Sequence, residues 1–179
     1  MKRVLFLVVL LAAFLSASCG RDQYRIHGRV IGNNLEDVQV FLVPLGHEDR
    51  ENVDSVHIHN HEFFFKGTKH WMCDIRLDKR HRIQAQNLLV VTEPGDIYVT
   101  IGPDSFGGGT PQNDSLQVWK ELTIEKNKMD NKFRYSGQKE QLDSMYAAYK
   151  ARTRQMALNV GEESVLGSFL LGLYPLPKE

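Results

Sequence analysis

The sequence predicts a mainly β protein: an antiparallel β-sandwich followed by C-terminal α-helices. Two observations support this fold class. Apolar and polar residues alternate with a period of two along much of residues 24–101, which is typical of strands with one buried face. From residue 112 onward, the apolar residues recur at the spacing of amphipathic helices. The chain of 179 residues suits one domain and an appendage, and two full domains are not expected.

The first two strands are expected at residues 24–30 and 38–42. In the first, Tyr24, Ile26 and Val30 alternate with polar residues, and the second carries an equivalent apolar series. The turn-prone residues 32–34, Gly-Asn-Asn, separate the two strands. Each strand should therefore turn one face toward a core and the other toward water.

A β-hairpin is expected next, with strands at residues 54–59 and 62–66 and a two-residue turn at Asn60 and His61. Such a turn would pair His59 with Glu62 and His57 with Phe64, and it would fix the rest of the register. Four apolar side chains then share one face, which we expect to be buried: Val56, Ile58, Phe63 and Phe65. The opposite face carries His57, His59 and Glu62.

Three further strands are expected at residues 71–77, 88–92 and 97–101. The first places Trp71, Cys73, Ile75 and Leu77 on one face. The sequence Glu-Pro-Gly-Asp at residues 93–96 connects the other two, and its Pro-Gly pair fits the centre of a type II turn. These strands complete the predicted β-sandwich.

Helices are expected from residue 112 to the C-terminus. Residues 107–109, Gly-Gly-Gly, should form a flexible connection, after which Thr110 can cap the first helix and Pro111 suits its first turn. We predict helices at residues 112–125, 138–160 and 164–174, with a polar linker at 126–137. Gly161 should end the middle helix.

The N-terminus predicts export and a lipid anchor. A basic start and an apolar run of about a dozen residues, too short to span a bilayer, precede small residues and Cys19. Residues 1–18 therefore read as a signal peptide, and Cys19 in this position resembles the lipobox cysteine of bacterial lipoproteins, with 19–23 as a tether. We expect an outer-membrane lipoprotein that faces the periplasm. The alternative is a plain secreted protein.

Composition excludes several classes of function. The chain has 22 basic and 22 acidic residues, so it lacks the basic excess typical of nucleic-acid binding. Its only cysteines are Cys19 and Cys73. If the first is acylated, no internal disulfide can form, and the chain has no CxxC redox pair. No cofactor is expected.

Several short sequences, in a characteristic order, resemble a known family. They are residues 24–28 (YRIHG), Asp54-Ser55 before the hairpin, residues 65–67 (FKG), residues 93–95 (EPG) and residues 109–114 (GTPQND). Together they resemble the N-terminal domain of unknown function in thioredoxin-like (AhpC/TSA-type, thiol-disulfide interchange) lipoproteins of Bacteroidetes. The resemblance implies a β-domain at residues 24–125 and a helical connector at 138–179, either complete or truncated. We find no thioredoxin-like domain with its CxxC in this chain, so no catalytic residue is assigned.

Two candidate sites follow from the residues themselves. His57, His59 and Glu62 on one hairpin face could form a zinc or copper site, because imidazole and carboxylate groups are common ligands of these metals. The simpler interpretation is the solvated outer face of a hairpin. Cys73 could be a reactive thiol only if it were exposed, and its strand phase instead predicts a buried, inert side chain.

We therefore expect a lipid-anchored envelope protein whose β-sandwich is a non-catalytic binding or accessory domain. Two alternatives remain: a truncated or split thiol-disulfide interchange protein, and a metal-binding envelope protein. The apolar stripe near the C-terminus needs a partner, either within the chain, on a second copy or on another protein. It consists of Leu166, Phe169, Leu170 and Leu173.

Overall fold

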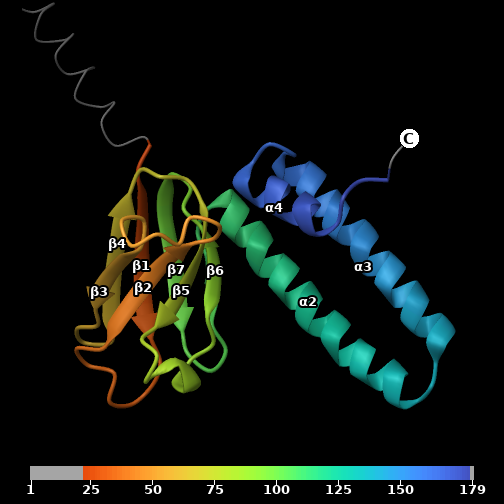
Figure 1. The fold of residues 1–179 in the computed structure, drawn as a ribbon, viewed down its shortest axis with the longest axis horizontal. Coiled ribbons are helices and arrows are strands. Elements are labelled where there is room, and N and C mark those ends of the chain that lie inside the picture. Colours follow the sequence, from red (N-terminus) through yellow and green to blue (C-terminus); the bar gives the residue numbers. More distant parts are fainter. Residues whose placement is uncertain (1–21, 178–179) are drawn as a thin grey trace, which may run out of the picture.

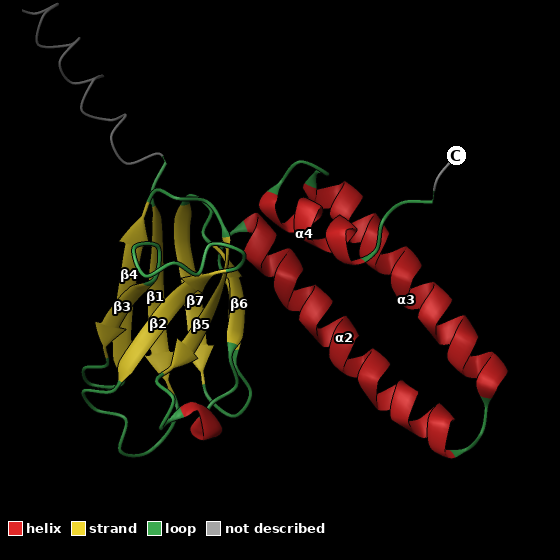
Figure 2. Cartoon of the chain, viewed as in Figure 1, coloured by secondary structure: helices red, strands yellow, loops and turns green. Residues whose placement is uncertain are grey.

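The computed structural model describes residues 22–177, and these form two four-stranded β-sheets followed by three helices (Figures 1 and 2). This arrangement confirms the predicted fold class. The predicted signal peptide and Cys19 lie outside the described residues. Among residues 22–177, no helix has the length and apolar character needed to cross a membrane.

The two sheets lie face to face (Figure 1). Sheet A has the strand order β4-β1-β7-β8, with bounds Glu62–Gly67, Tyr24–Val30, Gly95–Ile101 and Phe106–Gly108. Sheet B has the order β3-β2-β5-β6, with bounds Asp54–His57, Gln39–Pro44, Met72–Leu77 and Leu88–Val91. A short 3-10 helix, η1 (Arg82–Gln84), lies between β5 and β6.

Sheet A differs from the expected all-antiparallel sandwich in two respects. β1 and β7 pair in parallel, from Tyr24 opposite Gly95 to Val30 opposite Ile101. A parallel pair needs a long crossover, and the whole of sheet B lies between these two strands in the sequence. Residues 107–109 were expected to form a flexible connection, but Gly107 and Gly108 belong to the strand β8, which pairs with β7.

The hairpin turn is confirmed, but the two strands then separate. Asn60 and His61 both have positive φ angles, 54° and 64°, and His59 bridges to Glu62 as predicted. Beyond this bridge β3 pairs with β2, whereas β4 pairs with β1. The predicted pairing of His57 with Phe64 is therefore wrong, because the hairpin spans both sheets and its apolar residues meet across the core.

The main core lies between the two sheets. The predicted inward side chains Ile58, Phe63 and Phe65 are at most 5% exposed, and Val56 packs against the same cluster while remaining partly exposed. Burial of a large apolar side chain contributes about 1.5–3 kcal/mol relative to exposure. Period-two alternation therefore located the core correctly in both sheets.

Helices α2 (Pro111–Tyr135) and α3 (Lys139–Val160) form an antiparallel hairpin that extends away from the sandwich (Figure 2). The predicted linker at 126–137 is wrong, because α2 continues to Tyr135. Polar contacts hold this segment to α3: the Tyr146 hydroxyl donates to an Asp130 carboxylate oxygen at 2.9 Å. As predicted, Gly161 ends α3, at a φ of 97°.

The start of α2 is bound to the edge of sheet B. Asn113 is buried, and its side-chain oxygen accepts from the Val91 backbone N–H at 2.9 Å while its amide donates to the Val91 carbonyl at 2.8 Å. Thr110 is the N-cap residue, but the carboxylate of Glu93 satisfies the first backbone N–H groups, accepting from Gln112 N at 2.7 Å. These contacts connect the sandwich to the helices.

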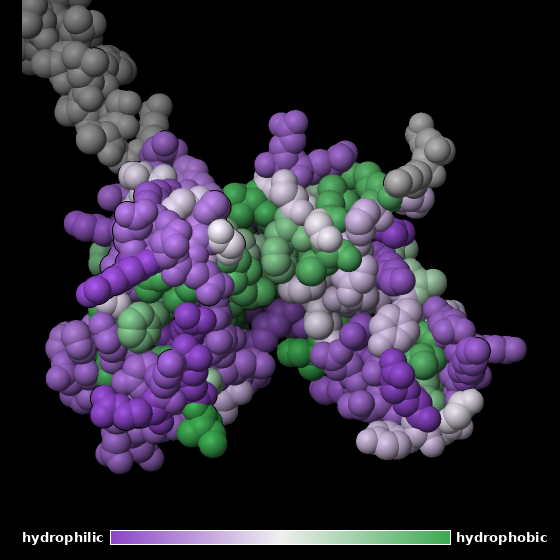
Figure 3. Space-filling model, viewed as in Figure 1, coloured by the Kyte–Doolittle hydropathy of each residue, from purple (hydrophilic) through white to green (hydrophobic). Residues whose placement is uncertain are grey.

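The last helix, α4 (Val165–Leu173), packs on α3 and also on the sandwich. Leu166 and Leu170 are fully buried in a second core with Met72, Val91, Leu116 and Ala157. The apolar stripe is thus largely covered within its own chain, and only Leu173 of the stripe is strongly exposed, at 48%. Figure 3 shows apolar residues gathered where α4 meets the sandwich.

Candidate functional site

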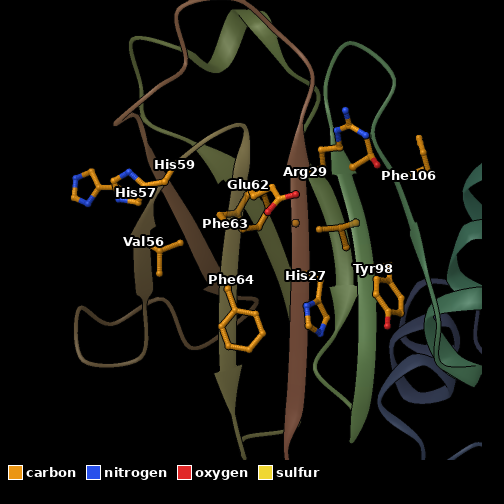
Figure 4. Close-up of a pocket in the computed structure, with 13 residues that line it drawn as sticks. His27, Arg29, Val56, His57, His59, Glu62, Phe63, Phe64, Tyr98 and Phe106 are labelled. Carbon is orange, nitrogen blue, oxygen red and sulfur yellow. The ribbon is translucent and has the colours of Figure 1, made fainter.

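The outer face of sheet A carries two adjacent levels of outward-pointing side chains. At the first level, the strand register aligns Phe64 of β4, His27 of β1 and Tyr98 of β7. Figure 4 shows these three rings side by side. At the next level along the strands lie Glu62, Arg29, Thr100 and Phe106.

Phe64, His27 and Tyr98 form what we call the aromatic row. The His27 ring stacks on Tyr98 at 19° between planes, and its centroid lies 5.1 Å from each neighbouring ring. Although the rings touch, Phe64 is 42% exposed and Tyr98 is 58% exposed. Outward positions of a sheet are ordinarily polar, so a contiguous row of exposed rings makes this face the candidate functional site.

The aromatic row borders an open hollow of about 860 Å³. Phe106, 51% exposed, lies toward β8, and His57 and His59 lie toward β3 (Figure 4). The complete lining is His27, Gly28, Arg29, Val56, His57, His59, Glu62, Phe63, Phe64, Tyr98, Val99, Thr100 and Phe106. The hollow thus combines exposed rings with one guanidinium, one carboxylate and three imidazoles.

Glycines make room for this arrangement. Beneath the face, the Phe63 ring packs on Gly28 so closely that a Cβ there would lie 2.0 Å from the ring. Beside the face, a Cβ on Gly109 would lie 2.9 Å from the Tyr98 ring, and Gly109 also has a φ of 102°, which favours glycine. Side chains at these two positions would displace the rings.

An ion-pair network lies on the other side of the aromatic row. Arg25 donates two hydrogen bonds to Asp96, at 2.6 and 2.7 Å, and the His27 Nε2 lies 3.0 Å from an Asp96 oxygen. The Arg25 guanidinium and then His27 hold the pKa of the Asp96 carboxyl well below its usual range. Asp96 therefore carries a negative charge that anchors the His27 ring.

The three candidate metal ligands, His57, His59 and Glu62, all line the hollow, but they do not converge. Figure 4 shows the imidazoles of His57 and His59 beside β3, whereas Glu62 extends toward β1. The His59 Nδ1 lies 3.6 Å from an oxygen of Glu36 instead. Among residues 22–177, no group of three or more His, Cys, Asp or Glu side chains is arranged to hold a metal ion. The geometry gives the metal-binding alternative no support.

Cys73 is buried, as its strand phase predicted. It is 2% exposed in the main core. Burial raises the pKa of the Cys73 thiol to about 12, so the nucleophilic thiolate is scarce near neutral pH. Cys73 is therefore poorly suited to thiol chemistry.

The aromatic row was not identified from the sequence, although a signal for it exists. His27, Phe64 and Tyr98 each lie between two inward-facing residues, so each occupies the solvent phase of its strand. A ring in that phase on three strands is unusual for a merely solvated face. Its significance emerges only when the strand order brings the three together.

Comparison with known proteins places the chain in a family but not with a characterised relative. No match was found among curated proteins, and no solved structure matches. A family described as a domain of unknown function (DUF4369) matches residues 24–117, which cover both sheets and the start of α2. On the strength of that match, which covers more than half of its length, the chain belongs to this DUF4369 family.

Proposed function

We propose that this chain is a lipid-anchored protein of the bacterial cell envelope, and that its β-sandwich binds a ligand on the outer face of sheet A without catalysis of its own. The observation that carries the binding role is the aromatic row, whose rings stay exposed beside an open hollow. Exposed rings are costly to leave in water, and rims of polar residues around them are typical of interaction sites.

The anchor is supported by the basic start, the apolar run and Cys19. Only four residues separate Cys19 from Tyr24, where β1 begins, and the five residue steps between the two reach at most about 18 Å. An acylated Cys19 would thus hold the first end of β1 close to the membrane. Arg29, near the other end of the same strand, lies roughly 17 Å from Tyr24 along the strand at 3.3 Å per residue.

Anchoring is tested by replacing Cys19. Radioactive palmitate should label the wild-type protein and not Cys19→Ala. The variant has no thiol to acylate at this position, so it should also leave the membrane fraction, since stable anchoring takes more than one acyl chain. Equal labelling of both proteins would contradict the anchor.

A role without catalysis is supported by the chemistry of the hollow. Its lining contains no serine or cysteine, and one of its three imidazoles, that of His27, is held beside the Asp96 carboxylate. The hollow is also open to water, whereas enzymes usually exclude water from reacting groups. These features favour recognition over reaction.

The binding role is tested by photo-crosslinking in cells. A photoreactive benzoylphenylalanine in place of Tyr98 should form adducts with the ligand. The matched control is the same replacement at Tyr135, which is 92% exposed at the end of α2. Adducts at position 98 and not at 135 would support the proposal. No adduct at position 98, or equal adducts at both positions, would refute it.

A further inference from the structure

We infer that the ligand of the outer face of sheet A is a chain of uncharged sugar rings; this inference rests on the proposed binding function. The exposed aromatic row suits such a ligand. One face of a pyranose ring carries mainly C–H groups, which pack on the negative face of an aromatic ring. Tyr98 is suited to this contact, because its register partner on β8 is Gly108, which has no side chain to cover the ring.

Two charged side chains beside the aromatic row offer hydrogen bonds to a sugar. Arg29 and Glu62 are register partners on adjacent strands, and among residues 22–177 neither side chain has an ion-pair partner. A guanidinium only donates hydrogen bonds, and a carboxylate only accepts them. A sugar hydroxyl can accept from the first and donate to the second, so a polyhydroxylated ring satisfies both.

The outer face of sheet A has a low net charge. Arg29 and Glu62 have opposite charges, and Arg25 is already neutralised by Asp96. Lys66, the exposed register partner of Arg25, leaves the face with a single surplus positive charge. One charge is far from the clustered basic residues through which proteins recognise a phosphate-rich chain such as a nucleic acid. The low net charge therefore favours an uncharged ligand.

The position of the face argues against an extended peptide. Peptides that bind β-sheets usually add a strand to an exposed edge and pair through their backbone. His27 and Tyr98 instead lie on β1 and β7, the two central strands of sheet A. From Phe64 on β4 to Phe106 on β8 the rings span three strand spacings, about 14 Å in all. That length suits a short stretch of an oligosaccharide.

The test is calorimetric titration of the full chain, purified in an amine-oxide detergent that has no sugar headgroup. The probes are maltohexaose, cellohexaose, mannohexaose, xylohexaose and chitohexaose. We expect at least one to bind with a Kd at or below about 1 mM. Tyr98→Ala should weaken that binding at least tenfold, and Glu62→Gln should weaken it several-fold. Tyr135→Ala, a change of the same kind on a distant surface, should leave it unaltered.

The outcomes separate the ligand class from the binding role. Binding of none of the five sugars overturns the saccharide inference, and adducts at position 98 in the crosslinking experiment would then leave the proposed function standing. Binding that Tyr98→Ala does not weaken, in a variant whose circular dichroism matches the wild type, also overturns it. Preferential binding of single-stranded DNA, or of a second copy detected by sedimentation, points to those ligands instead and refutes the inference.

Discussion

Asn113 joins the helices to the sandwich, and its replacement gives the sharpest test of how this fold is held together. Its side chain makes three hydrogen bonds: with the backbone N–H of Val91, with the backbone carbonyl of Val91 and with the Thr110 hydroxyl. In Asn113→Ala, the Val91 carbonyl still accepts from the Glu93 N–H, but the Val91 N–H loses the side-chain oxygen that accepts its hydrogen bond. Val91 is fully buried, so water cannot replace that oxygen without a rearrangement.

The magnitude follows from these contacts. A buried donor without a partner costs about 1–3 kcal/mol, and each of the other two lost bonds contributes about 0.5–1.5 kcal/mol. Because the surroundings relax, we expect Asn113→Ala to lower the free energy of unfolding by about 2–4 kcal/mol. Urea denaturation followed by tryptophan fluorescence measures this difference, since Trp119 lies on the same helix. The control is Asn127→Ala, at an exposed position of α2, where we expect a change within about 0.5 kcal/mol.

A second variant separates the hydrogen bonds from simple loss of packing. Asn113→Asp keeps the side-chain size but places a carboxylate against the Val91 carbonyl. Burial would raise the pKa of this new carboxyl above its unfolded value of about 3.9, so its stability penalty grows as the pH rises. The destabilisation by Asn113→Asp should therefore be larger at pH 7 than at pH 4. Equal unfolding free energies for Asn113→Ala, Asn127→Ala and the wild type would refute the reasoning.

Three further predictions concern the core, the ion pair and the last helix. Cys73 should resist iodoacetamide at pH 8 in the native protein and react after unfolding, as mass spectrometry would detect; rapid native labelling would contradict its burial. Asp96 has a lowered pKa, so its stabilising contribution is present above about pH 3.9 and is lost as the pH falls. The difference in urea midpoint between the wild type and Asp96→Asn should therefore shrink from pH 7 to pH 3, and a constant difference would count against the ion pair. Leu166→Ala should lower the free energy of unfolding by about 2–5 kcal/mol, because it leaves a cavity between α4 and the sandwich. Leu173 is half exposed, so Leu173→Ala should lower the free energy of unfolding much less.

The strands and the core could be predicted from the sequence because alternation is a local property. Each inward residue needs only its own strand phase, and the turn at Asn60 and His61 follows from its length. The partner of each strand is not a local property. Val56 and Phe65 both point inward. They would do so if their strands were paired in one hairpin, and they also do so here, where the strands belong to opposite sheets. Their shared apolar pattern could not distinguish the two arrangements.

The end of α2 was missed for a different reason. Residues 126–135 have too few apolar residues for a helical stripe to stand out. Polar groups join this part of α2 to α3: the Tyr146 hydroxyl donates to Asp130 and accepts from Arg134 at 3.3 Å. Arg134 also donates to Asp130 at 2.8 Å one turn away within α2. Hydrophobic periodicity cannot detect a helix whose partner is recognised through hydrogen bonds.

The aromatic row depends on the least local feature of all, the parallel pairing of β1 with β7. Arg25 and Asp96 are 71 residues apart in sequence, and their ion pair exists only because that pairing places them side by side. The same pairing brings His27 onto Tyr98. A single sequence can indicate that each ring occupies the solvent phase of its strand, but only the strand order makes the rings neighbours.

Residues 109–114 contribute both to the outer face of sheet A and to the helices. Gly109 leaves room for the Tyr98 ring, and Asp114 accepts a hydrogen bond from the Gly109 N–H at 2.8 Å. The preceding residue, Asn113, holds the edge of sheet B. A substitution in this segment would therefore disturb the ring position and the docking of α2 together. Binding and stability can be separated only by changes on the open face itself, where Tyr98 can be truncated without removing a buried contact of the helices.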